Sequence, residues 1–152
     1  MLSLLLSLHI FATIIWVGGM FFAHLVLRPS AIETLEAPLR LTLWHQVFKR
    51  FFFWVWLSVI TLVVTGYMII FMYFGGFAGV GIHVHIMQLS GLLMMVIYAY
   101  LYFATYQKFK NAVIIENWPQ AGQQLFKIRN IVTVNLILGL LTSMVAVVGR
   151  YF

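Results

Sequence analysis

The sequence contains no cysteine and very little charge: of its 152 residues only three are acidic and nine are Lys or Arg. The absence of cysteine excludes disulfides, thiolate metal sites and covalently attached c-type haem. Soluble domains carry about 25% charged residues, so a content of 8% excludes an ordinary soluble domain. Any bound metal must therefore be held by the five histidines, by methionine, by a carboxylate or by backbone oxygen.

Hydrophobic residues make up 64% of the chain and gather in long runs. About 20 apolar residues of helix cross the hydrocarbon core of a bilayer. Strands of a membrane barrel would alternate apolar and polar residues, and runs such as VWLSVITLVVTGYMIIFMYF do not alternate. We therefore predict an all-α fold, a single four-transmembrane-helix bundle over residues 1–152, with spans at about 2–27, 51–74, 84–106 and 129–150.

Basic residues are distributed unevenly between the connections. The segment GGFAGVGIHVH between the second and third spans has no Lys or Arg, and Arg150 alone follows the fourth span. Lys and Arg stay on the cytoplasmic side, so we expect both termini outside, in the periplasm, and a multi-pass protein of the bacterial inner membrane. The same placement explains the net charge of +6, so we expect lipid and no nucleic acid as partner. The other basic residues are Arg28, Arg40, Lys49, Arg50, Lys108, Lys110, Lys127 and Arg129.

Two signals predict where helices begin outside the spans. Ser30 and Glu33 have the spacing of a capping box, and Pro38 suits a first helical turn. Asn117 and Pro119 are typical of an N-cap followed by the start of a helix that runs into the fourth span.

Three histidines lie near the outer end of the predicted bundle. Ionisable side chains inside a span are costly and usually face the bundle interior. His9 lies about 10 Å below the outer end of the first span. His83 and His85 enter the third span from the same side; on a helix they point about 200° apart, whereas in an extended segment both can face one ligand. The alternatives are a hydrogen-bonded His9 and an interfacial loop end rich in histidine.

Near the inner surface, His24 and His45 are candidate ligands of a second cofactor. The alternative is a solvated His45 on an interfacial helix beside Trp44. Arg129 suits a propionate or a lipid phosphate. No carboxylate lies within a predicted span, which argues against transport coupled to a buried acid and against hydrolytic pairs or triads.

Methionines offer a different chemistry on the outer side. A thioether together with imidazole forms a ligand set for Cu(I), although methionine is also a common packing residue of apolar helices. The candidates are Met68, Met72, Met87 and Met144, with His83 and His85.

Three segments resemble a known family: HIFATIIWVGGMFFAHLVLRP, VHIMQLSGLLMM and IRNIVTVNLILGLL. They are similar to the CopD-like domain of copper resistance membrane proteins, and the layout is similar to that of the HemJ-type protoporphyrinogen oxidases. This resemblance implies b-type haem, or copper handling at the outer face, and it carries over to the residues His9, His83, His85, Arg129 and Asn130. His85 and Ile131 stand where the HemJ pattern has a lysine and an acid.

These observations lead to one hypothesis and two alternatives. The first is a haem b-binding, cytochrome b-like electron-transfer protein with His9 and either His85 or His83 as axial ligands. An open axial position would make the same site a haem-dependent oxidoreductase, and no catalytic residue is assigned. The second is a copper-binding or copper-transfer membrane protein, and the third is a membrane subunit that binds nothing. Each is compatible with a homodimer or a redox partner protein.

Overall fold

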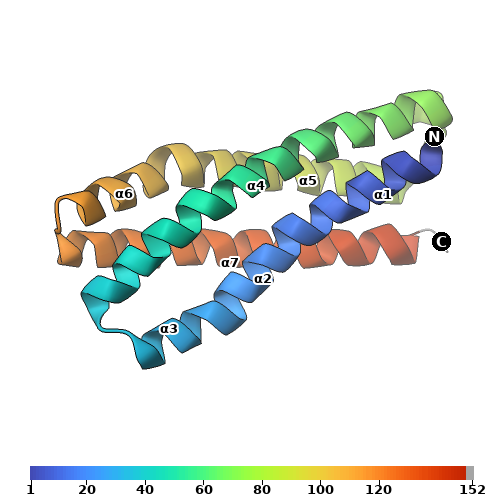
Figure 1. The fold of residues 1–152 in the computed structure, drawn as a ribbon. Coiled ribbons are helices and arrows are strands. Elements are labelled where there is room, and N and C mark those ends of the chain that lie inside the picture. Colours follow the sequence, from blue (N-terminus) through green and yellow to red (C-terminus); the bar gives the residue numbers. More distant parts are fainter. Residues whose placement is uncertain (150–152) are drawn as a thin grey trace.

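The computed structural model describes residues 1–149 and is helical throughout, with no strand in that range (Figure 1). Four long helices run through Leu2–Thr34, Ala37–Tyr73, Ile82–Ile114 and Trp118–Val148. Each is long and apolar enough to cross a membrane, which confirms the predicted four-helix membrane bundle. Arg150 lies outside the described residues.

All four helices are longer than the predicted spans because they continue beyond the apolar run. The first and third contain π-helical segments, which occur frequently at functional sites. The first comprises α1 (Leu2–Thr13), η1 (Ile14–Gly18), α2 (Gly19–Phe22), η2 (Ala23–Leu27) and α3 (Arg28–Thr34). The second is α4 (Ala37–Tyr73), followed by the short η3 (Phe77–Gly79). The third comprises α5 (Ile82–Tyr100), η4 (Leu101–Tyr106) and α6 (Gln107–Ile114), and the fourth is α7 (Trp118–Val148).

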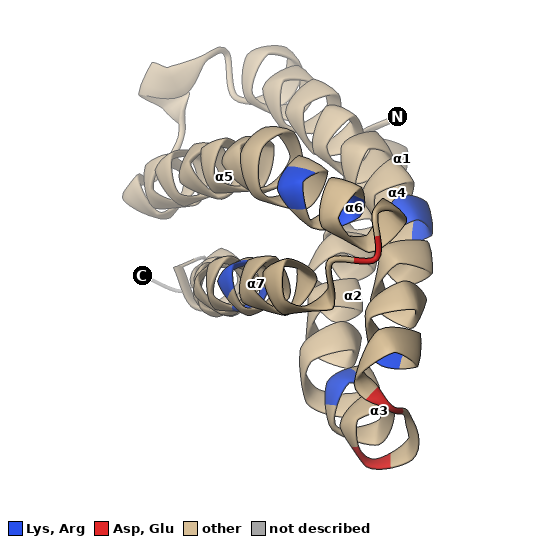
Figure 2. Ribbon diagram, turned by 90° about the vertical axis from the view of Figure 1, so that its left-hand side faces the viewer, with Lys and Arg blue, Asp and Glu red and all other residues tan. Residues whose placement is uncertain are grey.

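The bundle has two chemically different ends. We call the end with Leu2, Tyr73, Ile82 and Val148 the termini end, and the opposite end the basic end. Figure 2, which looks onto the basic end, shows Lys and Arg on its helices and the acidic residues at the two connections. Eight of the nine Lys and Arg residues lie in the helical segments that form this half.

The helices pack as two pairs that join at the basic half. α1 packs along α4 and α5 packs along α7, while α4 contacts α6 and α7 further down. The core lies mainly where the pairs meet, and it includes Trp16, Phe52, Tyr98, Phe109 and Ile128. The Tyr98 hydroxyl donates to the Phe52 carbonyl at 3.1 Å, which ties α5 to α4. Large apolar side chains cover the outside of the bundle, as expected for a surface that faces lipid.

The predicted helix starts had different outcomes. Asn117 is the N-cap of α7, and its side chain accepts a hydrogen bond from the Gln120 amide at 3.2 Å, as predicted. Pro38 lies in the first turn of α4, also as predicted. The capping box at Ser30 was wrong, because Ser30 lies inside α3 and its hydroxyl donates to the Val26 carbonyl one turn earlier.

Candidate functional site

His9 lies on the inward face of α1, half-buried against α4 near the termini end. Its Nδ1 atom is 2.8 Å from Oγ1 of Thr65 on α4. The neighbouring Gly66 makes room for the ring, since a Cβ atom there would lie 3.4 Å from Cε1 of His9. α4 therefore holds the imidazole through one polar contact and one close approach.

The hydrogen bonds of Thr65 determine which nitrogen of His9 carries the proton. The Thr65 hydroxyl has a single hydrogen, and it donates that hydrogen to the Thr61 carbonyl at 2.6 Å. The oxygen of Thr65 is thus the acceptor of an N–H from Nδ1 of His9. Nε2 of His9 keeps its lone pair, which is the arrangement that orients a metal-ligating histidine in known sites.

His83 and His85 lie on different sides of α5. His83 is half-buried against the end of α7, where a Cβ atom on Gly149 would overlap its side chain. His85 is exposed and stacks on Phe77, with the ring centroids 6.2 Å apart. The Phe77 ring also packs edge-on against the Tyr67 ring of α4, with the ring centroids 6.1 Å apart. His85 is therefore on the side of α5 that leads to α4, and His83 is on the side that leads to α7.

A second contact joins α5 to α4 beside these histidines. The Gln88 side chain, one turn after His85, donates to the Tyr67 hydroxyl at 2.9 Å. Tyr67 follows Gly66, against which His9 packs. These contacts connect α4 to α1 through Gly66 and to α5 through Tyr67, on whose side of α5 His85 lies.

The structure does not assemble these histidines into a metal site. Within residues 1–149, no group of three or more His, Cys, Asp or Glu side chains lies close enough to hold a metal ion. Of the outer methionines, Met68, Met72 and Met144 are exposed on the outside of the bundle, and Met87 is half-buried.

At the basic end, His24 and Arg129 line one cavity of about 460 Å³, which we call the basic cavity. Its walls come from α2, η2 and α3, from the first half of α4 and from the first half of α7. Arg28 and Arg40 also line it. His45 is not among the lining residues; its ring stacks on Tyr106 of η4 with the centroids 6.5 Å apart. The structure thus brings His24 together with Arg129 but separates it from His45.

Sequence reasoning missed the residues that surround His9 and the arginines that line the basic cavity with His24. Thr65 and Tyr67 are ordinary residues of an apolar run, and a threonine 56 positions from His9 gives no local signal of contact. The basic residues Arg28 and Arg40 were interpreted only as markers of orientation. A polar residue within a span was the available signal for Thr65, since a buried hydroxyl needs a partner.

Comparisons with known proteins give one family. The family model described as copper resistance protein D (CopD) matches residues 45–149. No curated protein and no solved structure matches the chain. The relation to the HemJ-type oxidases stays a prediction.

Proposed function

The chain belongs to the copper resistance protein D family, and we propose that it is a membrane redox protein that binds haem b, with His9 and His85 as the axial ligands. The observation that carries this proposal is the hydrogen bonding of His9, whose Nδ1–H donates to Thr65 while Nε2 has no partner among the described residues. A buried threonine inside an apolar helix that fixes one imidazole nitrogen is the support that a ligating histidine needs.

The residues of the termini end fit this role in three ways. The His9 ring packs against Gly66 of α4. His85 lies on the side of α5 nearest to α4, and the Gln88–Tyr67 hydrogen bond holds the two helices together there. When bound, haem supplies one-electron redox chemistry, and the protein sets its potential through axial ligation and a medium of low dielectric constant.

The exposure of His85 also bears on partners. A haem held between a half-buried and an exposed histidine would remain open on one side of the bundle. We therefore expect a second copy of the chain or a redox partner protein to cover that side.

Copper is the second candidate, and the family match favours it. The ligands would be Nε2 of His9 and the imidazole of His85, since imidazole is a common copper ligand. Copper held in this way would be bound without haem, and the protein would show no Soret band.

One set of spectra separates these functions. The protein is purified in detergent, its reduced-minus-oxidised spectrum is recorded, and haem and copper are quantified on the same sample. We expect sharp reduced α and β bands that are lost in His9→Ala and His85→Ala and retained in His83→Ala. Stoichiometric copper without a Soret band would favour the second candidate. Haem retained in His9→Ala, or a protein with neither ligand, would contradict the proposal.

A further inference from the structure

The basic cavity carries a second inference, which goes beyond the proposed haem site at the other end of the bundle. Its polar lining consists of three arginines and one histidine: Arg28, Arg40, Arg129 and His24. The described residues include all three glutamates of the chain, and none of them lines the cavity. Three guanidinium groups around one space repel one another unless an anion lies between them.

The arginines keep most of their donors available. Each guanidinium has five N–H donors in a fork that matches a carboxylate or a phosphate. Nε of Arg28 is buried without a hydrogen-bond partner among the described residues. Arg40 donates from one terminal nitrogen to the Leu35 carbonyl at 3.1 Å, and Arg129 lies over the Phe126 ring at 5.5 Å.

His24 adds an acceptor to this lining. The Thr133 hydroxyl donates its hydrogen to the Arg129 carbonyl at 2.9 Å, so its contact with Nε2 of His24 at 3.4 Å uses an N–H from the ring. Nδ1 of His24 is then free to accept a hydrogen bond. An alcohol or a protonated acid group on a ligand can supply that hydrogen.

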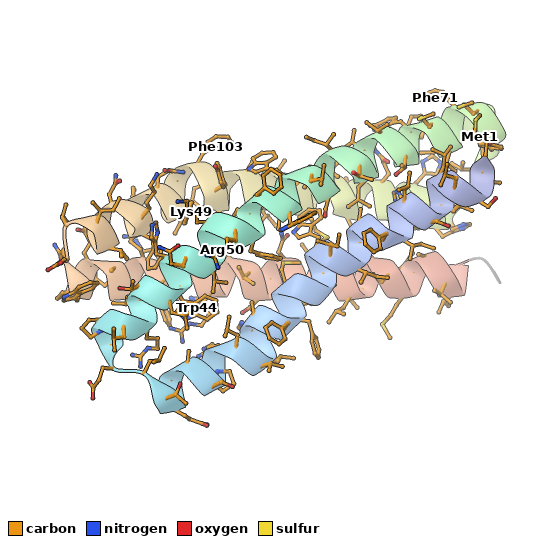
Figure 3. All side chains as sticks on the ribbon, in the orientation of Figure 1. Met1, Trp44, Lys49, Arg50, Phe71 and Phe103 are labelled. Carbon is orange, nitrogen blue, oxygen red and sulfur yellow. The ribbon has the colours of Figure 1, made fainter. Side chains whose placement is uncertain are left out.

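The rest of the lining is apolar and includes five aromatic residues. Trp44 lines the cavity from the first half of α4, at the basic end (Figure 3). Apolar walls with a few convergent polar groups are typical of sites for small amphipathic molecules, and 460 Å³ falls within their usual size. The other aromatic lining residues are Phe48, Phe51, Phe52 and Trp118.

We propose that the basic cavity binds an amphipathic anion, a molecule with an apolar body and a carboxylate or phosphate head that the three arginines hold. Two sources share this chemistry: an anionic phospholipid of the surrounding leaflet and a free fatty acid. The positive-inside rule places the basic end on the cytoplasmic side, where anionic lipid heads are concentrated.

Gly122 provides a test that leaves every charge in place. It lines the cavity from α7, and a Cβ atom there would meet no described atom within 4 Å. Gly122→Leu therefore fills the cavity without a clash at its Cβ. Gly91 on α5 is equally open and does not line the cavity, so Gly91→Leu is the matched control.

The full chain is placed in nanodiscs of phosphatidylcholine, and tryptophan fluorescence is followed while brominated quenchers are added. Trp44 and Trp118 line the cavity and report on its occupant. We expect saturable quenching by brominated phosphatidylglycerol or by dibromostearate in excess of that by brominated phosphatidylcholine. An excess with phosphatidylglycerol identifies the lipid as the source, and an excess with dibromostearate alone identifies the free acid.

The variants test whether the excess quenching comes from binding in the basic cavity. We expect Gly122→Leu to remove the excess, Gly91→Leu to retain it, and Arg28→Gln to weaken binding about tenfold because charge-assisted hydrogen bonds are lost. Arg28→Gln also serves if Gly122→Leu fails to fold. Equal quenching by all three probes, or an excess that both Gly122→Leu and Arg28→Gln leave unchanged, would overturn the proposal. None of these measurements depends on haem.

Discussion

Nδ1 of His9 lies 2.8 Å from Oγ1 of Thr65, and this contact joins α1 to α4 close to the termini end of the bundle. The threonine is 97% shielded from solvent and already donates to its own helix. It therefore acts toward His9 only as an acceptor. The contact fixes both the orientation and the protonation of the imidazole, which is why it carries the proposed ligand role.

Replacing Thr65 by valine keeps the shape of the side chain and removes the acceptor. Loss of the group that orients a metal-ligating histidine typically weakens metal affinity about 10–100-fold. We expect Thr65→Val to lower haem or copper occupancy by that order, measured per purified protein. Thr61→Val is the control, because among the described residues the Thr61 hydroxyl bonds to the Leu57 carbonyl of the same helix and not to His9. Equal occupancy in the two variants would show that Thr65 does not support His9.

Gly139 determines how closely α7 approaches its neighbours. A Cβ atom there would lie 2.8 Å from Cγ2 of Val17 and 3.0 Å from Cε of Met94. Val17 has no flexible end that can move aside, so we expect Gly139→Ala to destabilise the bundle by about 1–3 kcal/mol. The free energy of unfolding in detergent measures this change. Gly91→Ala, in open space on α5, should be neutral or stabilising. Equal free energies of unfolding for the two variants would show that the close approach at Gly139 does not limit which side chain the bundle accepts there.

The elements of the fold that the sequence predicts correctly rest on local signals. Four runs of apolar residues suffice to locate the four helices. A segment that crosses lipid must form all of its backbone hydrogen bonds internally, and a helix does so. Asn117 caps α7 as predicted because an N-cap acts on amides two or three residues away. Ser30 carried an equally local signal and failed, since the first helix continues through it as α3. Ala31, the residue after Ser30, is buried where the helix continues.

The site depends on contacts between distant segments, and these leave no local pattern. Nothing in the sequence around Thr65 or Gly66 distinguishes them from other small residues of an apolar helix. The same holds for the basic cavity, because Arg28, Arg40 and Arg129 come from three helices and were interpreted as one charged face. Local reasoning therefore singled out His9 and His24, both of which are half-buried in the structure, but not what surrounds them.

Asn135 tests the cost of a polar group in the middle of the bundle. It is buried on α7, its Nδ2 donates to the Met94 carbonyl at 3.3 Å, and its Oδ1 has no partner among the described residues. An unpaired buried acceptor costs about 1–3 kcal/mol, more than the roughly 1 kcal/mol that one hydrogen bond contributes. We expect Asn135→Leu to leave the free energy of unfolding unchanged or to raise it, whereas Asn135→Asp should lower it by burying a charge. A clear loss of stability in Asn135→Leu would show that Oδ1 has a partner in the membrane.

The orientation of the bundle can be tested directly because the chain has no cysteine of its own. Ala78 is exposed on η3 at the termini end, and Glu33 is exposed on α3 at the basic end. Both Ala78→Cys and Glu33→Cys should be tolerated, since neither side chain is buried. The positive-inside rule predicts that a membrane-impermeant maleimide labels Ala78→Cys in intact cells, with the outer membrane permeabilised if there is one, and labels Glu33→Cys only after lysis. The reverse pattern would place the basic cavity outside, and it would put His9 and His85 on the cytoplasmic side. That result would also change the leaflet from which the basic cavity takes a lipid, because anionic heads are concentrated on the cytoplasmic face.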